Sequence, residues 1–163
     1  DGFEKNKIFL PQLLMSADSA KAAFDEIKAH MIVNGNSQVK GEKIIIATVE
    51  GDIHDIGKNI VRSVLENYGF RIIDLGRDVP EQTVVDAVIK SGAKLCGLSA
   101  LMTTTVPAME QTIKLLNEQA PFCKTVVGGA VLNADYAAKI GADYYSKDAA
   151  ATVRAAKEVY GRN

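Results

Sequence analysis

Residues 43–49 read Lys-Ile-Ile-Ile-Ala-Thr-Val, a short run of mostly β-branched residues without polar alternation. A strand of a parallel sheet has this composition, because helices cover both of its faces and neither face is left to water. A loop rich in glycine and polar residues follows at 50–57, and apolar residues then recur at helical spacing from about residue 58 to 68. The segment therefore predicts one strand–loop–helix unit of a parallel sheet.

The same unit recurs along the rest of the chain. Further strands are expected at 70–75, 94–100, 125–129 and 143–146, and further helices near 81–91, 105–119, 133–140 and up to about 160. Five strands that alternate with five helices predict an α/β fold with a five-stranded parallel, doubly wound sheet of the Rossmann or flavodoxin type. Right-handed crossovers favour the strand orders 2-1-3-4-5 and 3-2-1-4-5.

The residues before this repeat follow a different pattern. Apolar side chains recur at helical spacing from Leu10 to Met31, and Asn34-Gly35-Asn36-Ser37 interrupts them. This segment is too short for a helical bundle of its own. We therefore expect residues 1–36 to be the C-terminal part of a helical unit and residues 37–163 to be the α/β domain. Because the first residue is Asp1 rather than Met, we expect a trimmed or fragmentary chain.

Composition argues against two classes of partner. Lys and Arg number 19 and Asp and Glu number 20, so the net charge of −1 gives no electrostatic reason to expect nucleic acid or an anionic membrane. No apolar run approaches the roughly 18 residues of a spanning helix. Cys96 and Cys123 are the only cysteines, and both lie in apolar runs. Buried free thiols of this kind favour a reducing, cytoplasmic location.

Ligands of such sheets bind outside the carboxyl ends of the strands, where the strand order reverses. The loops after the first, third and fourth strands, residues 50–57, 99–105 and 128–130, are therefore the candidate site. The first of them is not a phosphate-binding P-loop, because five residues rather than four separate its glycines and Asn59 follows Lys58. The dinucleotide pattern G-x-G-x-x-G is also absent after this strand.

His54 lies in the first of these loops, between Asp52 and Asp55. A carboxylate can hold one ring nitrogen of a histidine while the other nitrogen binds a metal. The alternative is a hydrogen-bonded loop histidine with aspartates that cap a helix. Zinc needs three or four protein ligands, and His30, Cys96 and Cys123 lie on segments that do not point at this loop. A metal on His54 would therefore arrive with most of its coordination filled, which implies a macrocycle.

The stretch Gly51-Asp52-Ile53-His54-Asp55-Ile56-Gly57-Lys58-Asn59, the triplet Ser99-Ala100-Leu101 and the pair Gly128-Gly129 together resemble a known signature. They are similar to the D-x-H-x-x-G, S-x-L and G-G motifs of cobalamin-binding domains. With Phe9-Leu10-Pro11-Gln12, the resemblance is closest to the methyltransferase type, which includes the corrinoid proteins of methanogens and acetogens and the cobalamin module of methionine synthase.

The resemblance implies a role for each motif. His54 would be the lower axial ligand of cobalt, Asp52 would hold its other nitrogen, and Thr105 would extend that relay, although Thr105 also fits a helix N-cap before Pro107. Ser99 would bind the buried nucleotide tail of the cofactor. Gly128 and Gly129 would leave room for it, or would form a tight turn. Cofactor contacts are further implied for Ile53, Asp55, Ile56, Gly57, Leu101, Met102, Thr103 and Ala130.

The same resemblance gives the leading segment a function. Phe3 and Leu10 have the seven-residue spacing of two residues that cover the upper face of the corrin in this family, in a helical cap of which residues 1–36 would be the last part. The alternative is that both side chains belong to a helical core.

The function implied is that of a corrinoid-binding methyl carrier, which alternates between Co(I) and methyl-Co(III) and catalyses little alone. Its partners would be a cobamide cofactor, donor and acceptor methyltransferase subunits and a reductive activator, with the choice of methyl donor made by the partner enzyme. One alternative is a module of methionine synthase or of another large enzyme. A second is a corrinoid-dependent sensor domain without methyl transfer.

Overall fold

The structure is a computed structural model that describes residues 41–162, together with Phe9, Met15 and Ser19. The chain divides into two units, Asp1–Lys40 and Gly41–Asn163. Phe3 and Leu10, on which the expected covering of the corrin depends, lie outside the described residues. Within the described part of the chain, no helix is both long enough and apolar enough to cross a bilayer.

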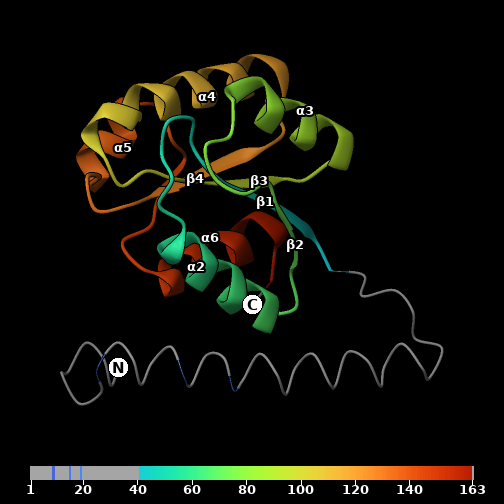
Figure 1. The fold of residues 1–163 in the computed structure, drawn as a ribbon. Coiled ribbons are helices and arrows are strands. Elements are labelled where there is room, and N and C mark those ends of the chain that lie inside the picture. The colour runs from blue at the N-terminus through green and yellow to red at the C-terminus, as the bar shows by residue number, and fades with distance from the viewer. Residues whose placement is uncertain (1–8, 10–14, 16–18, 20–40, 163) are drawn as a thin grey trace. The chain divides into compact units, whose positions relative to one another are not determined.

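Five parallel strands alternate with five helices in the second unit (Figure 1). The elements are β1 (Lys43–Thr48), α2 (Ile56–Asn67), β2 (Arg71–Asp74), α3 (Glu81–Ser91), β3 (Leu95–Ser99), the 3₁₀ turn η1 (Thr103–Thr105), α4 (Val106–Gln119), β4 (Lys124–Gly128), α5 (Ala134–Lys139), β5 (Tyr144–Tyr145) and α6 (Ala149–Tyr160). The strand order is β2-β1-β3-β4-β5. The predicted α/β class is confirmed, and so is the first of the two predicted orders.

The central strand β1 explains the arrangement of layers. Its side chains alternate, so that Ile45 and Ala47 enter one apolar cluster while Ile44 and Ile46 enter the other, all nearly inaccessible to solvent. Figure 1 shows α3, α4 and α5 over the first face of the sheet and α2 and α6 over the second. An apolar run without alternation is therefore what a strand between two helical layers requires.

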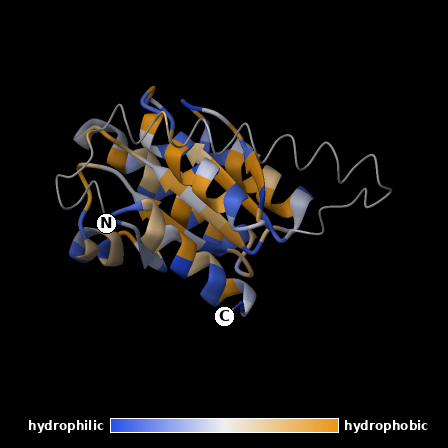
Figure 2. Ribbon diagram, turned by 90° about the horizontal axis from the view of Figure 1, so that it is seen from below, coloured by the Kyte–Doolittle hydropathy of each residue, from blue (hydrophilic) through white to orange (hydrophobic). Residues whose placement is uncertain are grey.

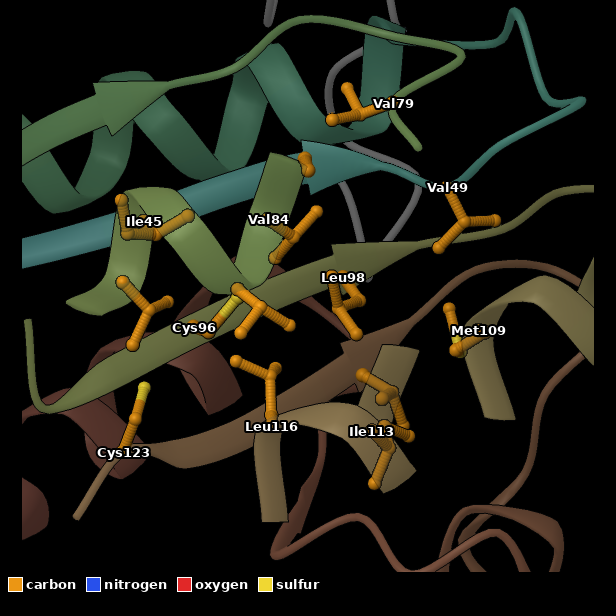
Figure 3. Packing of buried hydrophobic residues seen from close by; sticks show 14 of the residues in the cluster. Ile45, Val49, Val79, Val84, Cys96, Leu98, Met109, Ile113, Leu116 and Cys123 are labelled. Carbon is orange, nitrogen blue, oxygen red and sulfur yellow. The ribbon is translucent and has the colours of Figure 1, made fainter. Parts of the chain in front are cut away.

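The two faces are filled to different extents. The cluster beneath α3 and α4 is continuous, and Figure 3 shows Ile45, Cys96 and Leu98 of the strands packed against Val84 of α3 and Leu116 of α4. The strands are the most hydrophobic part of the domain in Figure 2. The cluster beneath α2 and α6 is smaller and includes Ile44, Leu95 and Phe70. This second face therefore leaves space beside the sheet, and the cavity described below occupies it.

Helix α2 begins at Ile56, two residues before the predicted start. Its N-cap residue Asp55 makes no side-chain capping bond, unlike Asp148 of α6, whose Oδ1 accepts the Ala151 N–H at 2.7 Å. The first turn of α2 follows directly on the loop that carries His54. The strand order reverses between β1 and β3, which places this loop at the ligand-binding edge of the sheet.

Candidate corrinoid-binding site

A fully buried carboxylate, that of Asp52, organises the loop after β1. Its Oδ1 accepts the backbone N–H of His54 at 3.0 Å and lies 2.8 Å from His54 Nδ1. Two bonds from one oxygen to the same residue fix both the backbone and the ring of His54. With Asp52 ionised, Nδ1 carries the hydrogen and donates it, so Nε2 keeps its lone pair for a ligand.

The second oxygen of Asp52 ties this loop to the one after β3. Oδ2 accepts the N–H of Leu101 at 2.6 Å, the N–H of Met102 at 3.3 Å and the hydroxyl of Thr105 at 3.0 Å. Burial alone would raise the pKa of Asp52. The hydrogen bonds from Leu101, His54 and Thr105 outweigh burial and hold the pKa of this carboxyl far below its usual value.

Thr105 occupies the N-cap position of α4, but its side chain makes no capping bond there. Its hydroxyl lies 3.0 Å from Asp52 Oδ2 and 2.9 Å from the carbonyl oxygen of Met102. The capping alternative for this hydroxyl is therefore excluded. The structure places Thr105, Asp52 and His54 in one hydrogen-bonded series.

The ring of His54 is 46% exposed and borders a cavity of about 680 Å³. This cavity lies beside the carboxyl half of the sheet, between β1, β3 and β4 on one side and α2 and α6 on the other. Its walls near the sheet are apolar, with Ile46, Val126 and Val61 among them. Such a slot suits a flat, largely apolar group rather than an ion.

Most of the predicted contact residues line this cavity, namely Ile53, His54, Asp55, Ile56, Gly57, Ser99, Leu101, Gly128, Gly129 and Ala130. Asp52 and Thr105 lie behind His54 and reach the cavity through it. Met102 and Thr103 do not line it. Ile53 and Ile56 are 62% and 69% exposed, so the rim around His54 presents apolar side chains to solvent.

At both glycines of the predicted pair, the backbone of the protein itself leaves little room for a side chain. A Cβ on Gly129 would lie 1.8 Å from the carbonyl oxygen of Ala100, and a Cβ on Gly128 would lie 3.0 Å from that of Ser146. Gly129 also has φ +139°, which L side chains rarely adopt. The tight approach of backbone segments thus explains Gly129 whether or not a ligand is bound, and Gly128 borders the cavity as well.

Gly97 in β3 is the cavity glycine that the sequence reasoning missed. A Cβ there would make ordinary van der Waals contacts with Ile46 Cγ2 at 3.4 Å, Val126 Cγ1 at 3.7 Å and the carbonyl oxygen of Ile45 at 3.8 Å, and Gly97 lines the cavity. Its missing side chain therefore leaves space that the fold itself does not need. The signal was present, because a glycine inside an apolar strand often marks the close approach of a ligand.

Lys58 is a second residue that was not predicted. Its side chain is only 4% exposed, lines the cavity, and lies 2.6 and 2.8 Å from the two oxygens of Asp74 at the end of β2. Burial acts to raise the pKa of Asp74, but the hydrogen bond from Lys58 lowers it below its usual value. This ion pair fastens the first turn of α2 to the sheet beside the His54 loop.

The opposite wall of the cavity carries two hydroxyls that were also not predicted. Ser146 Oγ donates to the carbonyl oxygen of Asp148 at 2.6 Å and lies 2.6 Å from Thr152 Oγ1. Both residues line the cavity. Ser146 follows β5, and Thr152 lies in the first turn of α6. Their position at the cavity therefore depends on β5, an edge strand of only two residues.

The fold and site define a doubly wound α/β domain that presents an oriented imidazole above an apolar slot. The family model for the B12 binding domain matches residues 42–156. Dimethylamine corrinoid protein 1 of Methanosarcina acetivorans is 42% identical over 159 residues, which are 96% of this chain and 74% of that protein. The chain therefore belongs to the B12-binding family, among its corrinoid proteins, and its cofactor is a cobamide.

Solved structures give the same answer. A cobalamin-binding protein from Desulfitobacterium hafniense matches with a TM-score of 0.80 at 34% identity, over 97% of this chain and 74% of that one. A chain of the methanol:cobalamin methyltransferase complex MtaBC from Methanosarcina barkeri matches with a TM-score of 0.81 at 33% identity, over 99% of this chain and 62% of that one. The predicted family resemblance is confirmed.

The residues present fit a cobamide. The donor set offers one imidazole whose other nitrogen is held by a carboxylate, as a metal-bound histidine requires. The cavity has apolar walls, and Gly97 lines it without a side chain that would extend into it. One site for a metal and one for an apolar planar group thus lie side by side at the carboxyl edge of the sheet.

Proposed function

We propose that this chain is the methyl-carrying corrinoid subunit of a methyltransferase system. The single observation that carries the proposal is the contact of Asp52 Oδ1 with His54 Nδ1 at 2.8 Å, because it leaves one histidine nitrogen at the edge of a large cofactor cavity. When bound, the cobamide supplies the methyl-accepting and methyl-donating chemistry at cobalt. The contribution of the protein is to bind, orient and shield that group.

His54 is the residue that would hold the cobalt. Asp52 keeps the hydrogen of the ring on Nδ1, so Nε2 presents a lone pair, and the negative charge of Asp52 raises the basicity of that nitrogen. Thr105 donates to Asp52 and thereby keeps the orienting carboxylate in place. The three residues belong to two loops, so the orientation of the imidazole depends on the relative position of β1 and β3.

The slot between the sheet and α2 is the proposed site of the nucleotide tail of the cofactor. Ser99 supplies a hydroxyl at its mouth, and Gly97 and Gly128 leave its sheet side open. Burial of the tail in an apolar slot would supply binding affinity that is independent of His54. The remaining predicted contacts of the three loops, from Ile53 to Ala130, would surround the corrin.

The proposed partners are donor and acceptor methyltransferase subunits and a reductive activator. Membership among the corrinoid proteins supports the first two, and the methanol:cobalamin methyltransferase complex shows a related chain within such an assembly. Residues 1–36 would form the end of a helical cap. A cytoplasmic location is also proposed, since Cys96 and Cys123 are buried free thiols.

Two experiments test the proposal in order. The chain is first mixed with hydroxocobalamin, freed of unbound cofactor and examined by absorption spectroscopy, and binding of one corrinoid is expected. The loaded and reduced protein is then methylated with iodomethane and mixed with a corrinoid-dependent thiol methyltransferase. Loss of the methyl group to the thiol is expected. A protein that binds no corrinoid, or that retains its methyl group with every such partner, would contradict the proposal.

A further inference from the structure

The loop between β2 and α3 runs beside the His54 loop and bonds to it at consecutive residues. The N–H of Gly51 donates to Asp78 Oδ1 at 2.7 Å, and the N–H of Asp78 donates to the carbonyl oxygen of Asp52 at 3.0 Å. Arg77 Nη1 adds a longer bond of 3.4 Å to the carbonyl oxygen of Ile53. Asp78 therefore contacts the backbone on both sides of the peptide that leads into Asp52.

The same loop is fastened to the central strand. The N–H of Val79 donates to the carbonyl oxygen of Thr48 at 3.1 Å, and the N–H of Thr48 donates to that of Gly76 at 3.0 Å. Val79 also pairs with Val49 in a parallel bridge. Asp78 is consequently held by the sheet on one side, and its bonds can transmit the position of the sheet to the His54 loop.

Asp78 takes this position at a conformational disadvantage. Its φ of +53° makes it the one non-glycine residue with positive φ in the described part of the chain. Glycine adopts this conformation without penalty, whereas most other residues do not. A glycine at this position would relieve the backbone but would remove the carboxylate that accepts from Gly51. An aspartate in the left-handed region is thus explained by what its side chain does.

Electrostatics does not explain the carboxylate either. The neighbouring carboxylate of Glu81, and to a smaller extent that of Asp78, raises the pKa of Glu50. A further negative charge among these acids is unfavourable. Asp78 therefore matters as a hydrogen-bond acceptor for the N–H of Gly51 rather than as a negative charge. A neutral acceptor at this position should serve equally well.

We propose that Asp78 is a positioning residue for His54, acting through Gly51 and Asp52. It holds the backbone of Gly51 and Asp52, which fixes where the Asp52 carboxylate meets the His54 ring and the N–H of Leu101. The inference rests on the proposed function of His54 as a cobalt ligand. It adds a fourth loop segment to a site that sequence motifs place on the loops after β1, β3 and β4.

Three substitutions at one position separate the contributions. Asp78→Asn keeps an acceptor oxygen and tolerates positive φ, so it is expected to behave as the parent protein. Asp78→Gly keeps the backbone conformation and loses only the acceptor. Asp78→Ala loses the acceptor and adds strain. Asp86→Ala is the matched control, because it removes an exposed aspartate of α3 that bonds only to Gln82 among the described hydrogen bonds.

The first measurement uses the full chain without corrinoid. Backbone hydrogen exchange is followed at Leu101, whose N–H donates to Asp52 and has no contact with Asp78 among the described bonds. Asp78→Gly is expected to speed this exchange about threefold to tenfold, the effect of one weakened hydrogen bond. Asp78→Asn and Asp86→Ala should leave it unchanged. Faster exchange at Gly51 alone would overturn the proposal, because Asp78 would then hold only its direct partner.

The second measurement uses the same proteins loaded with cobalamin. Electron paramagnetic resonance of the Co(II) state reports the share of protein with nitrogen from His54 on cobalt. Asp78→Gly is expected to lower that share, and Asp78→Asn is expected to keep it at the value of the parent. The melting temperatures of both variants should stay close to that of the parent. An equal share in all variants would contradict the proposal. A parent protein without histidine ligation would contradict the proposed function instead, and the exchange measurement would still decide the role of Asp78.

Discussion

The backbone N–H of Leu101 donates a 2.6 Å hydrogen bond to Oδ2 of Asp52. This bond joins the loops that follow β1 and β3, the two strands between which the sheet reverses its order. The other oxygen of Asp52 holds the ring of His54. The position of the imidazole is therefore tied to the separation of two neighbouring strands, and a parallel sheet holds that separation rigidly.

Replacing Asp52 tests this connection. Asp52→Asn keeps one acceptor oxygen but loses the charge, so we expect ligation of cobalt by His54 to weaken by on the order of 10–100-fold while corrinoid still binds. Spectroscopic titration of the loaded protein with a competing axial ligand such as imidazole measures the effect. Asp86→Asn is the control, because Asp86 is an exposed aspartate of α3, away from the cavity, whose side chain bonds to Gln82. Equal effects of the two substitutions would show that Asp52 has no special role.

The buried pair of Lys58 and Asp74 should stabilise the fold more than an exposed pair of the same kind. Lys58→Met leaves Asp74 with Arg62, whose Nη1 is 3.4 Å away, and with the N–H of Gly76. We expect a loss of about 3 kcal/mol in the free energy of unfolding. Lys124→Met removes the ion-pair partner of Asp143. Because the side chain of Lys124 is 53% exposed, we expect a much smaller loss than for Lys58→Met. Urea unfolding of both corrinoid-free variants provides the comparison.

Enlarging Gly97 should close the slot in steps. An added Cβ meets Ile46 at an ordinary 3.4 Å, so Gly97→Ala should fold as the parent does and bind cobalamin slightly less tightly. The branched side chain of Gly97→Val extends into the cavity and should weaken binding at least about tenfold. Equilibrium dialysis gives the affinities, and thermal unfolding without corrinoid shows whether the fold is intact. Unchanged affinity in a folded Gly97→Val protein would exclude this slot as the binding site of the tail.

Acid should destabilise the protein through carboxylates whose pKa is lowered by folding. Burial raises the pKa of Asp143, but hydrogen bonds from Lys124 and Thr125 bring it below its usual value. The stabilisation from such a group is complete above the unfolded-state pKa of about 3.9 and is lost as the pH falls through the lower folded-state value. The difference in unfolding free energy between the parent and Asp143→Asn should therefore shrink from pH 6 towards about pH 3. A difference that stays constant over this interval would contradict the shift.

The fold could be predicted because a strand that is covered by helices on both faces has apolar residues at successive positions, and this pattern is visible in the sequence. The uninterrupted run from Ile44 to Ala47 is possible only for a strand covered on both faces, and it set the class of the whole domain. Boundaries were less accurate where local signals were weak. Helix α2 begins at Ile56 without a side-chain cap, so no capping residue marked its start.

The site could be predicted only as far as motifs reach along the chain. Asp52 and His54 are two residues apart, and their contact follows from a loop signal. Lys58 meets Asp74, and Gly51 meets Asp78, only because β2 lies beside β1. Both predicted strand orders place β2 beside β1, but which side chains meet there depends on the strand register and on the loop conformations, which the sequence does not show. Gly97 was overlooked because its role depends on which face of β3 borders the cavity.

The central claim is that His54 binds the cobalt of the cofactor, and nitrogen hyperfine coupling tests it most directly. The chain is labelled with ¹⁵N in its histidines, loaded with unlabelled cobalamin and reduced to Co(II), and its electron paramagnetic resonance spectrum is compared with that of unlabelled protein. We predict that each line split into three by axial ¹⁴N becomes split into two by ¹⁵N, and that His54→Gly, which retains His30, loses this change. A threefold splitting that survives the labelling would place the cofactor's own base on cobalt and contradict the account.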